Sequence, residues 1–223
     1  MTVTVLHLAD EGEAADLAAF LSRLLHYDRS AAVRLQAAGT ALAVFGRPPS
    51  FEVLAIRAVR LAKPYENGLD VTLDVTVSAG ELLESVDEAA ATAVVPGAVT
   101  GPPWAGVLPP RGGWRAVPGL PEPPALRELV AASVAEFRSR TEELEPERRT
   151  RAELDRIGRE IWSRTVAGTG LPVRAVHAAQ SLGFLRGDEL GLFSSGAWLR
   201  LRTPYGSVAV RRAGLGALGL SVR

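Results

Sequence analysis

Apolar and polar residues alternate along five stretches in the first half of the chain, and this period of two predicts β-strands. The stretches are residues 2–8, 32–38, 41–46, 51–61 and 69–77. Turn signals at Gly39-Thr40 and at residues 47–50 separate the three central stretches, so these should form an antiparallel meander. The alternation is clearest in residues 69–77, which follow a turn at Asn67-Gly68.

Two helices should connect these strands, because apolar residues recur between them at helical spacing. The first helix should begin at a cap formed by Asp10 and end near His26. The second should begin at a cap formed by Ser78 and reach about Ala91. In both cases a glutamate stands three positions after the capping residue, which is the spacing of a capping box.

Residues 95–124 contain nine of the fifteen prolines, together with Trp104 and Trp114. Unstructured connections of this length are uncommon inside compact domains. The segment is therefore a linker, a binding loop or an extended arm wrapped on the sheet, and the tryptophans favour the arm. Its proline pairs also suit a polyproline II segment presented to a partner domain, or simply a stiffened crossing.

Three helices should open the second half of the chain. The first begins at Pro124 and stops before Pro146, and the charge run at its far end should be a solvated face with ion pairs. Thr150 caps the next helix. Pro172 suits a first helical turn and opens a shorter helix, which Gly183 closes.

The stretch WLRLRTPYGSVAVRR, residues 198–212, predicts a β-hairpin around the turn at residues 203–206. The expected cross-strand pairs are Leu201 with Val208, Arg200 with Ala209, Leu199 with Val210, and Trp198 with Arg211. Because neighbours on a strand point to opposite faces, the leucines and valines share one face. The other face carries Trp198, Arg200, Arg202 and Arg211. These side chains suit phosphates and a stacked base, and they equally suit a solvated face paired with the protein's own carboxylates.

The predicted fold class is α+β: an N-terminal antiparallel sheet with two helices, a proline-rich crossing, and C-terminal helices ending in a basic β-hairpin. The expected division is residues 1–94, 95–124 and 125–223. A strand at residues 207–212 could instead complete a sheet begun earlier, which would make one continuous core.

The element order over residues 2–93, strand, helix, three strands, strand and helix, resembles part of a processivity-clamp domain, with SAGELLESV at residues 78–86 as its motif-like piece. In clamps the helices line a basic bore. The helix after Asp10 carries Glu11, Glu13 and Asp16 against Arg23 alone. A role in encircling DNA is therefore not carried over from the resemblance.

Residues 151–212, with two helices, strands and a basic hairpin, resemble a winged helix-turn-helix. The resemblance implies that Arg174, His177 and Gln180 face DNA from the second helix. It also implies that the hairpin arginines Arg200, Arg202, Arg211 and Arg212 contact phosphates. Two features depart from the family: the second helix, VRAVHAAQS, carries one permanent charge, and the full apolar face of the hairpin is more typical of a strand inside a sheet.

The composition indicates a globular protein, since 47% of its 223 residues are apolar. The net charge is zero, but residues 1–110 carry 7 basic and 13 acidic residues, whereas residues 111–223 carry 18 basic and 12 acidic residues. The basic half either meets an outside partner or docks on the acidic half. The absence of cysteine, of a long apolar run and of a leader peptide predicts a cytoplasmic protein without a membrane segment. Abundant alanine and arginine, with Lys63 the only lysine, are typical of GC-rich bacteria.

No glycine-rich phosphate loop, nucleophile elbow or metal-ligand spacing occurs in the sequence, and no cofactor is predicted. We consider three hypotheses. The protein binds nucleic acid, most simply DNA, without catalysis. Alternatively, it is a protein-interaction or assembly module, acting on a partner or as a homo-oligomer, with anchors among Trp104, Trp114, Trp162 and Trp198. The third hypothesis is an enzyme without a motif, in which His7 with Asp10 and Glu11, or His177, would lie in a pocket.

Overall fold

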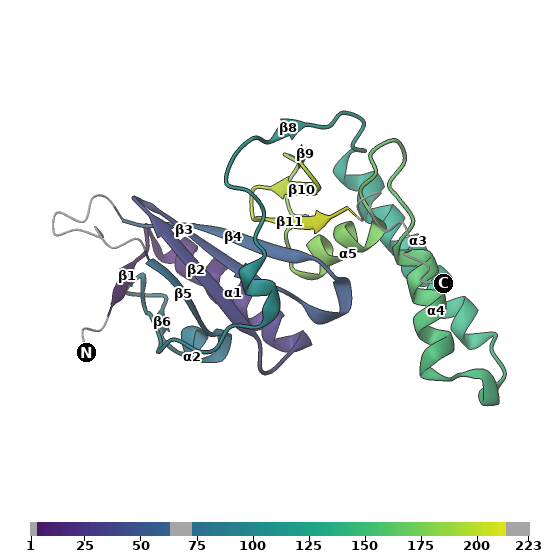
Figure 1. The fold of residues 1–223 in the computed structure, drawn as a ribbon, viewed down its shortest axis with the longest axis horizontal. Helices are drawn as coiled ribbons and strands as arrows, with labels where there is room; N and C mark the ends of the chain where they lie inside the picture. Colours follow the sequence, from purple (N-terminus) through teal and green to yellow (C-terminus); the bar gives the residue numbers. More distant parts are fainter. Residues whose placement is uncertain (1–3, 63–72, 213–223) are drawn as a thin grey trace, which may run out of the picture.

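A computed structural model describes residues 4–62 and 73–212. This part of the chain forms an α+β fold with two antiparallel sheets, which confirms the predicted fold class (Figure 1). The smaller sheet has the strand order β1-β7-β6, and the larger has the order β5-β2-β3-β4-β11-β10-β9-β8.

The elements follow the alternation closely. The strands are β1 (Val5–His7), β2 (Ala32–Ala38), β3 (Ala41–Gly46), β4 (Leu54–Arg60), β5 (Leu73–Ser78), β6 (Val86–Asp87), β7 (Thr92–Val94), β8 (Arg115–Ala116), β9 (Gly191–Ser195), β10 (Trp198–Thr203) and β11 (Gly206–Arg211). The helices are α1 (Glu11–Tyr27), α2 (Ala79–Glu84), α3 (Pro123–Glu142), α4 (Arg151–Trp162) and α5 (Val173–Ser181), with single 3-10 turns η1 (Pro49–Phe51), η2 (Pro103–Gly106) and η3 (Pro146–Arg148). The predicted meander is confirmed as β2-β3-β4. The Asn67-Gly68 turn and residues 69–72 lie outside the described residues.

The predicted helix caps form, but one helix is shorter than expected. Asp10, Ser78 and Thr150 each accept a hydrogen bond from the backbone N–H three residues later, at 2.9, 3.3 and 3.3 Å. The prediction that α2 reaches Ala91 is wrong, because α2 ends at Glu84. The Ser85 hydroxyl donates to the carbonyl of Val94 in β7 and so ties the helix end to the small sheet.

The C-terminal strand joins the two halves of the chain. β11 pairs with β4 through Ile56–Ser207, Ala55–Val208 and Leu54–Ala209. The hairpin β10–β11 therefore lies inside the eight-stranded sheet, with β9 on its other side. Of the two arrangements that the sequence leaves open for residues 207–212, the structure shows the strand paired with the earlier sheet.

The inner face of the large sheet is covered by helices. α1 packs against β4, and α5 packs against β11. The hairpin residues Leu199, Leu201, Val208 and Val210 are buried in the same apolar cluster as Leu17, Leu21 and Leu24 of α1. Burial of this apolar surface is the main force that holds helices and sheet together.

The outer face of the large sheet is crossed by residues 95–124, which form an arm (Figure 1). Trp104 and Leu108 of the arm pack on a second apolar cluster of Phe45, Leu54, Ile56 and Ala209. The Arg34 side chain donates to the carbonyl of Ala105, and the Val117 N–H donates to the carbonyl of Leu192 at 2.8 Å. Of the alternatives for this segment, the structure shows the arm wrapped on the sheet.

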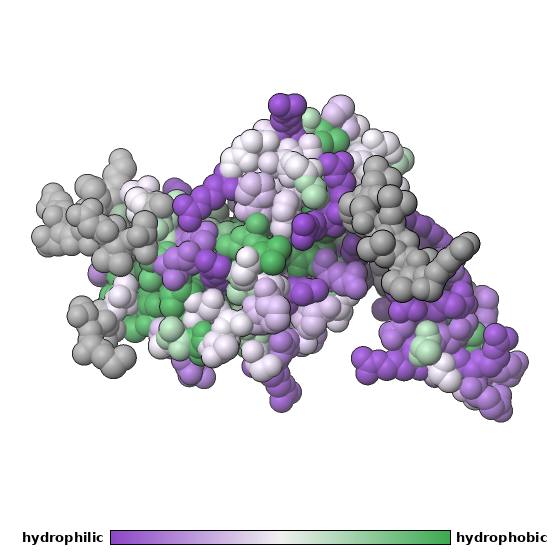
Figure 2. Space-filling model, viewed as in Figure 1, coloured by the Kyte–Doolittle hydropathy of each residue, from purple (hydrophilic) through white to green (hydrophobic). Residues whose placement is uncertain are grey.

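Helices α3 and α4 lie side by side and project from the body of the molecule (Figure 1). Figure 2 shows that hydrophilic residues cover their projecting end. Ion pairs cross between the helices or their flanks, Arg140 with Glu160 at 2.8 Å and Arg164 with Glu136 at 2.5 Å. The charge run is thus a solvated face with ion pairs, as the spacing predicts. Among the described residues, no helix is long and apolar enough to span a bilayer.

Candidate nucleic-acid interface

The hairpin register is the one that the sequence predicts. Trp198 pairs with Arg211, Arg200 with Ala209, and Leu201 with Val208. The ladder continues to Thr203–Gly206, so Pro204 and Tyr205 form the turn. Alternation then places Arg200 and Arg202 on the outer face, opposite the face that α5 covers.

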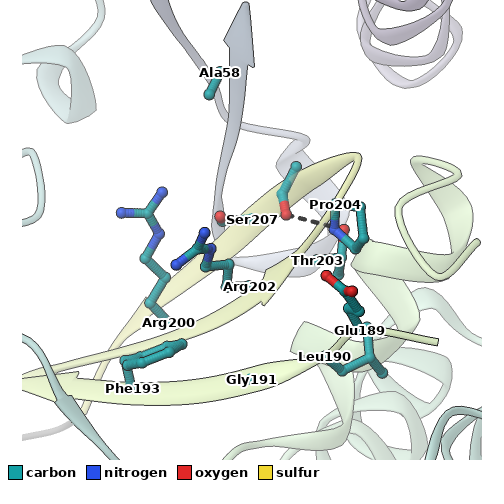
Figure 3. A pocket seen from close by; sticks show the side chains of 11 residues that line it. Ala58, Glu189, Leu190, Gly191, Phe193, Arg200, Arg202, Thr203, Pro204 and Ser207 are labelled. Atoms are coloured by element: carbon teal, nitrogen blue, oxygen red, sulfur yellow. Dashed lines mark hydrogen bonds between the residues drawn. The ribbon is translucent and has the colours of Figure 1, made fainter. Parts of the chain in front are cut away.

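Two adjoining hollows on the outer face together form what we call the basic groove. One, of about 440 Å³, is lined by Ala58, Glu189, Leu190, Gly191, Phe193, Arg200, Arg202, Thr203, Pro204, Gly206 and Ser207. The other, of about 340 Å³, is lined by Ala58, Trp114, Phe193, Arg200 and Arg202. Four residues are common to both hollows, so the two are continuous. Figure 3 shows the Arg200 and Arg202 side chains next to each other, with Phe193 beside Arg200 and Glu189 at the far side.

Within the described ranges, the two arginines of the groove have no acidic partner. Neither Arg200 nor Arg202 forms an ion pair with any residue in the described part of the chain. Arg200 is half-buried, and its Nε is buried without a hydrogen-bond partner among residues 4–62 and 73–212. Burial and repulsion from Arg202 lower the pKa of Arg200, although arginine stays protonated in proteins. The groove is therefore a concentrated positive site.

Aromatic and small side chains shape this positive site. Phe193 of β9 pairs across the sheet with Arg200 and lines both hollows. The Trp114 ring, contributed by the arm, lies 5.8 Å from the Arg200 guanidinium carbon. Ala58, Gly206 and Ser207 are short residues of the neighbouring strands, and they leave the space above the sheet open.

The remaining candidate residues of the hairpin line neither hollow, and they differ in their contacts. Arg211 is exposed on the outer face and makes no ion pair with the residues that the structure describes. Arg212 is also exposed, and it donates to the carbonyl of Gly196 at 2.8 Å. Trp198 is half-buried against the second apolar cluster, where the indole packs on the protein itself.

The three residues predicted on α5 lie on the other side of the sheet. Arg174 is 3.9 Å from a carboxylate oxygen of Glu52, and Gln180 is exposed. The His177 ring stacks on Trp162 at 4.5 Å, and burial lowers the pKa of His177. Because α5 covers the inner face, the structure does not bring these side chains together with Arg200 and Arg202. The projecting wing of a winged helix is also not shown, since both hairpin strands are internal to a sheet.

The other candidate residues are engaged within the protein. Trp104, Trp114 and Trp162, like Trp198, are half-buried rather than exposed. Asp10 caps α1 and pairs with Arg60 at 3.1 Å. Within the described residues, no group of three potential ligands could hold a metal ion.

Sequence reasoning missed Phe193 and Ala58. The signal for Phe193 was present, because the alternation in Gly191–Ser195 places Phe193 opposite to Leu192. No local signal identifies Ala58, because its place in the groove follows from the pairing of β4 with β11.

Two family models match the chain, and both describe domains of unknown function. Residues 1–106 match the domain DUF8010, and residues 109–215 match the domain DUF8185. A search of curated proteins finds no match.

The similar solved structures include DNA polymerase sliding clamps. A clamp from Pseudomonas aeruginosa shares 13% identity at a TM-score of 0.49 and covers 93% of this chain and 64% of the clamp. The sliding clamp from Pseudomonas aeruginosa with ligand shares 12% sequence identity at a TM-score of 0.47, and the match covers 95% of this chain and 64% of the clamp. The beta subunit of Streptococcus pyogenes DNA polymerase shares 10% sequence identity at a TM-score of 0.47, and the match covers 87% of this chain and 62% of the subunit. The chain thus spans less than two thirds of each clamp, and its function must be argued from its own residues.

Proposed function

We propose that the protein is a non-catalytic binding protein that holds nucleic acid on the outer face of its sheet, with Arg200 and Arg202 contacting phosphates. The observation that carries this proposal is the pair of neighbouring guanidinium groups without an acidic partner in the described residues. A half-buried charge is costly to leave unpaired. An anionic ligand would supply the missing partner.

Phosphate is the anion that these side chains suit best. Guanidinium groups present parallel N–H donors that match phosphate oxygens, and contacts to phosphates fix a protein on a nucleic acid. Arg211 extends the positive surface along the same face. Because the chain as a whole has no net charge, the attraction must be local to this face.

The residues of the groove fit binding better than catalysis. Its ionisable side chains are two arginines and Glu189. Thr203 is occupied in the turn, where its hydroxyl donates to the carbonyl of Gly206 and accepts from the Tyr205 N–H. Ser207 also lines the groove, but among the described residues no hydrogen bond joins its hydroxyl to the carboxylate of Glu189, as activation of a nucleophile by a base would require.

The test is fluorescence anisotropy with a labelled random-sequence DNA, as duplex and as single strand, at about 50 and 200 mM salt. Arg200→Ala/Arg202→Ala is compared with Arg138→Ala/Arg151→Ala, which removes the same charge from exposed positions on α3 and α4. We expect wild-type binding to weaken with salt, the groove variant to lose at least tenfold in affinity, and the control to stay within twofold. No binding at low salt, or equal losses in both variants, would refute the proposal.

A further inference from the structure

We infer that the basic groove takes single-stranded nucleic acid, with a phosphate at Arg200 and Arg202 and a base stacked on Phe193. This inference rests on the proposed function and adds the class of strand. It is carried by two aromatic rings that line one hollow together with two guanidinium groups, and these groups have no acidic partner in the part of the chain that the structure describes.

The aromatic rings are placed for stacking. Phe193 is only half-buried and lines both hollows, so part of its ring faces the groove. The Trp114 indole N–H donates to the carbonyl of Pro110 at 3.0 Å, which holds the ring in position over the groove. Aromatic side chains interleaved with cations are the usual platform for single strands, because every base has a π-face.

The depth of the groove argues against a duplex. Arg200 is half-buried in the hollow, and the short side chains of Ala58 and Ser207 line it nearby. In a duplex the base faces are stacked on one another inside the helix, so no internal base face is free to stack on the half-buried Phe193. A hollow of about 440 Å³ lies in the range of sites that enclose small ligands, roughly 300–1,000 Å³. Its size fits one or two unstacked nucleotides.

Glu189 limits the length of strand that the groove can hold. Its exposed carboxylate lies at the far side of the groove from Phe193, near Pro204 (Figure 3). A second phosphate placed there would meet a like charge. The phosphates of a bound strand are therefore attracted only in the surroundings of Arg200 and Arg202.

The test compares three labelled ligands in the full chain: a twelve-nucleotide thymidine strand, an abasic strand with the same phosphates, and a duplex of the same length. Phe193→Leu removes the ring and keeps an apolar side chain. Phe137→Leu is the matched control, because Phe137 is also half-buried but lies between α3 and α4 against Trp162. Circular dichroism and thermal unfolding check that both variants fold.

We expect the thymidine strand to bind wild type at least tenfold more tightly than the abasic strand, since stacking contributes roughly 1–3 kcal/mol per base. Phe193→Leu should remove most of this difference and leave abasic binding within twofold, and Phe137→Leu should change neither. Equal binding of thymidine and abasic strands, or no effect of Phe193→Leu, would overturn this inference while leaving phosphate binding intact. Failure of all three ligands to bind would refute the proposed function itself. Competition by polyglutamate as strong as by the thymidine strand would instead identify an acidic protein segment as the occupant.

Discussion

Arg57 and Arg200 lie on opposite faces of the same sheet and differ in whether a carboxylate lies beside the guanidinium group. Each is at least half-buried, and each has a buried Nε without a hydrogen-bond partner in the described part of the chain. The Arg57 Nη2 contacts the carboxylates of Glu13 and Asp16, both at 3.1 Å. The Arg57 Nη1 donates to the carbonyl of Tyr205 at 2.8 Å. Among residues 4–62 and 73–212, no carboxylate forms an ion pair with Arg200.

The difference gives Arg57 a structural role and supports the binding role that we propose for Arg200. Arg57 links α1, β4 and the turn between β10 and β11, so its ion pairs hold the two halves of the chain together. Arg200 makes no ion pair with the residues that the structure describes, and burial lowers its pKa. A residue type alone therefore says little, and the neighbouring carboxylates decide between a stabilising and a binding role.

The largest expected effect is the loss of the inner network. Arg57→Met should lower the free energy of unfolding by about 3 kcal/mol, because removing one partner leaves the poorly exposed carboxylate of Glu13 with less compensation. Urea unfolding measures the change. A loss below about 1 kcal/mol would show that the network is not a structural link.

A bound thymidine strand should stabilise the folded protein only through contacts with the outer face of the sheet. The thymidine strand at ten times its Kd should raise the free energy of unfolding of wild type by about 1.4 kcal/mol, equivalent to about 3–6 °C in Tm. Arg200→Ala/Arg202→Ala should show almost no shift at the same strand concentration. An equal shift in both proteins would place the ligand elsewhere.

Arg200→Met should leave the free energy of unfolding unchanged or raise it, whereas Arg57→Met should lower it. Arg200→Met removes an unpaired, half-buried charge, so without ligand we expect unfolding free energy that is unchanged or higher by up to about 1 kcal/mol. Urea unfolding at low salt compares the two methionine variants directly. A clear destabilisation by Arg200→Met would mean that Arg200 is a structural residue.

The smallest effect is expected at a third arginine, Arg34, which is paired on the outer face. Its Nε contacts the Asp74 carboxylate at 2.7 Å, and this hydrogen bond lowers the pKa of Asp74 below its ordinary value. Because the pKa of Asp74 is lower in the folded than in the unfolded protein, its ionised form stabilises the fold above about pH 4. This stabilisation is lost as the pH falls further. Asp74→Asn should therefore cost a few tenths of a kcal/mol at pH 7, because the pair is partly exposed, and nothing near pH 2. Urea unfolding at the two pH values checks this, and a cost that persists at pH 2 would assign the effect to something other than charge.

Local patterns were sufficient for most elements and for one face of the candidate site. The caps at Asp10 and Thr150 and the pairs of the hairpin were predictable, because capping and alternation depend on residues a few positions apart. The end of α2 was not predictable, because it depends on a hydrogen bond from Ser85 to a strand that follows it.

The candidate site was only half predictable. Alternation placed Arg200 and Arg202 on one face, whereas nothing in the local pattern indicated whether a carboxylate would lie opposite them. Arg174 and His177 were expected beside them, but α5 packs on the inner face and separates the two sets.

The sequence by itself determined where most of the strands and helices form and which hairpin residues are apolar or basic, because these properties depend on period and on near neighbours. Only the tertiary structure decided that β11 pairs with β4 and that the arm crosses the outer face. These arrangements bring Ala58, Trp114 and Phe193 to Arg200, and they keep the acidic side chains of α1 on the opposite face with Arg57. The physical reason is that pairing between distant strands depends on the burial of the whole apolar surface, which no short stretch encodes.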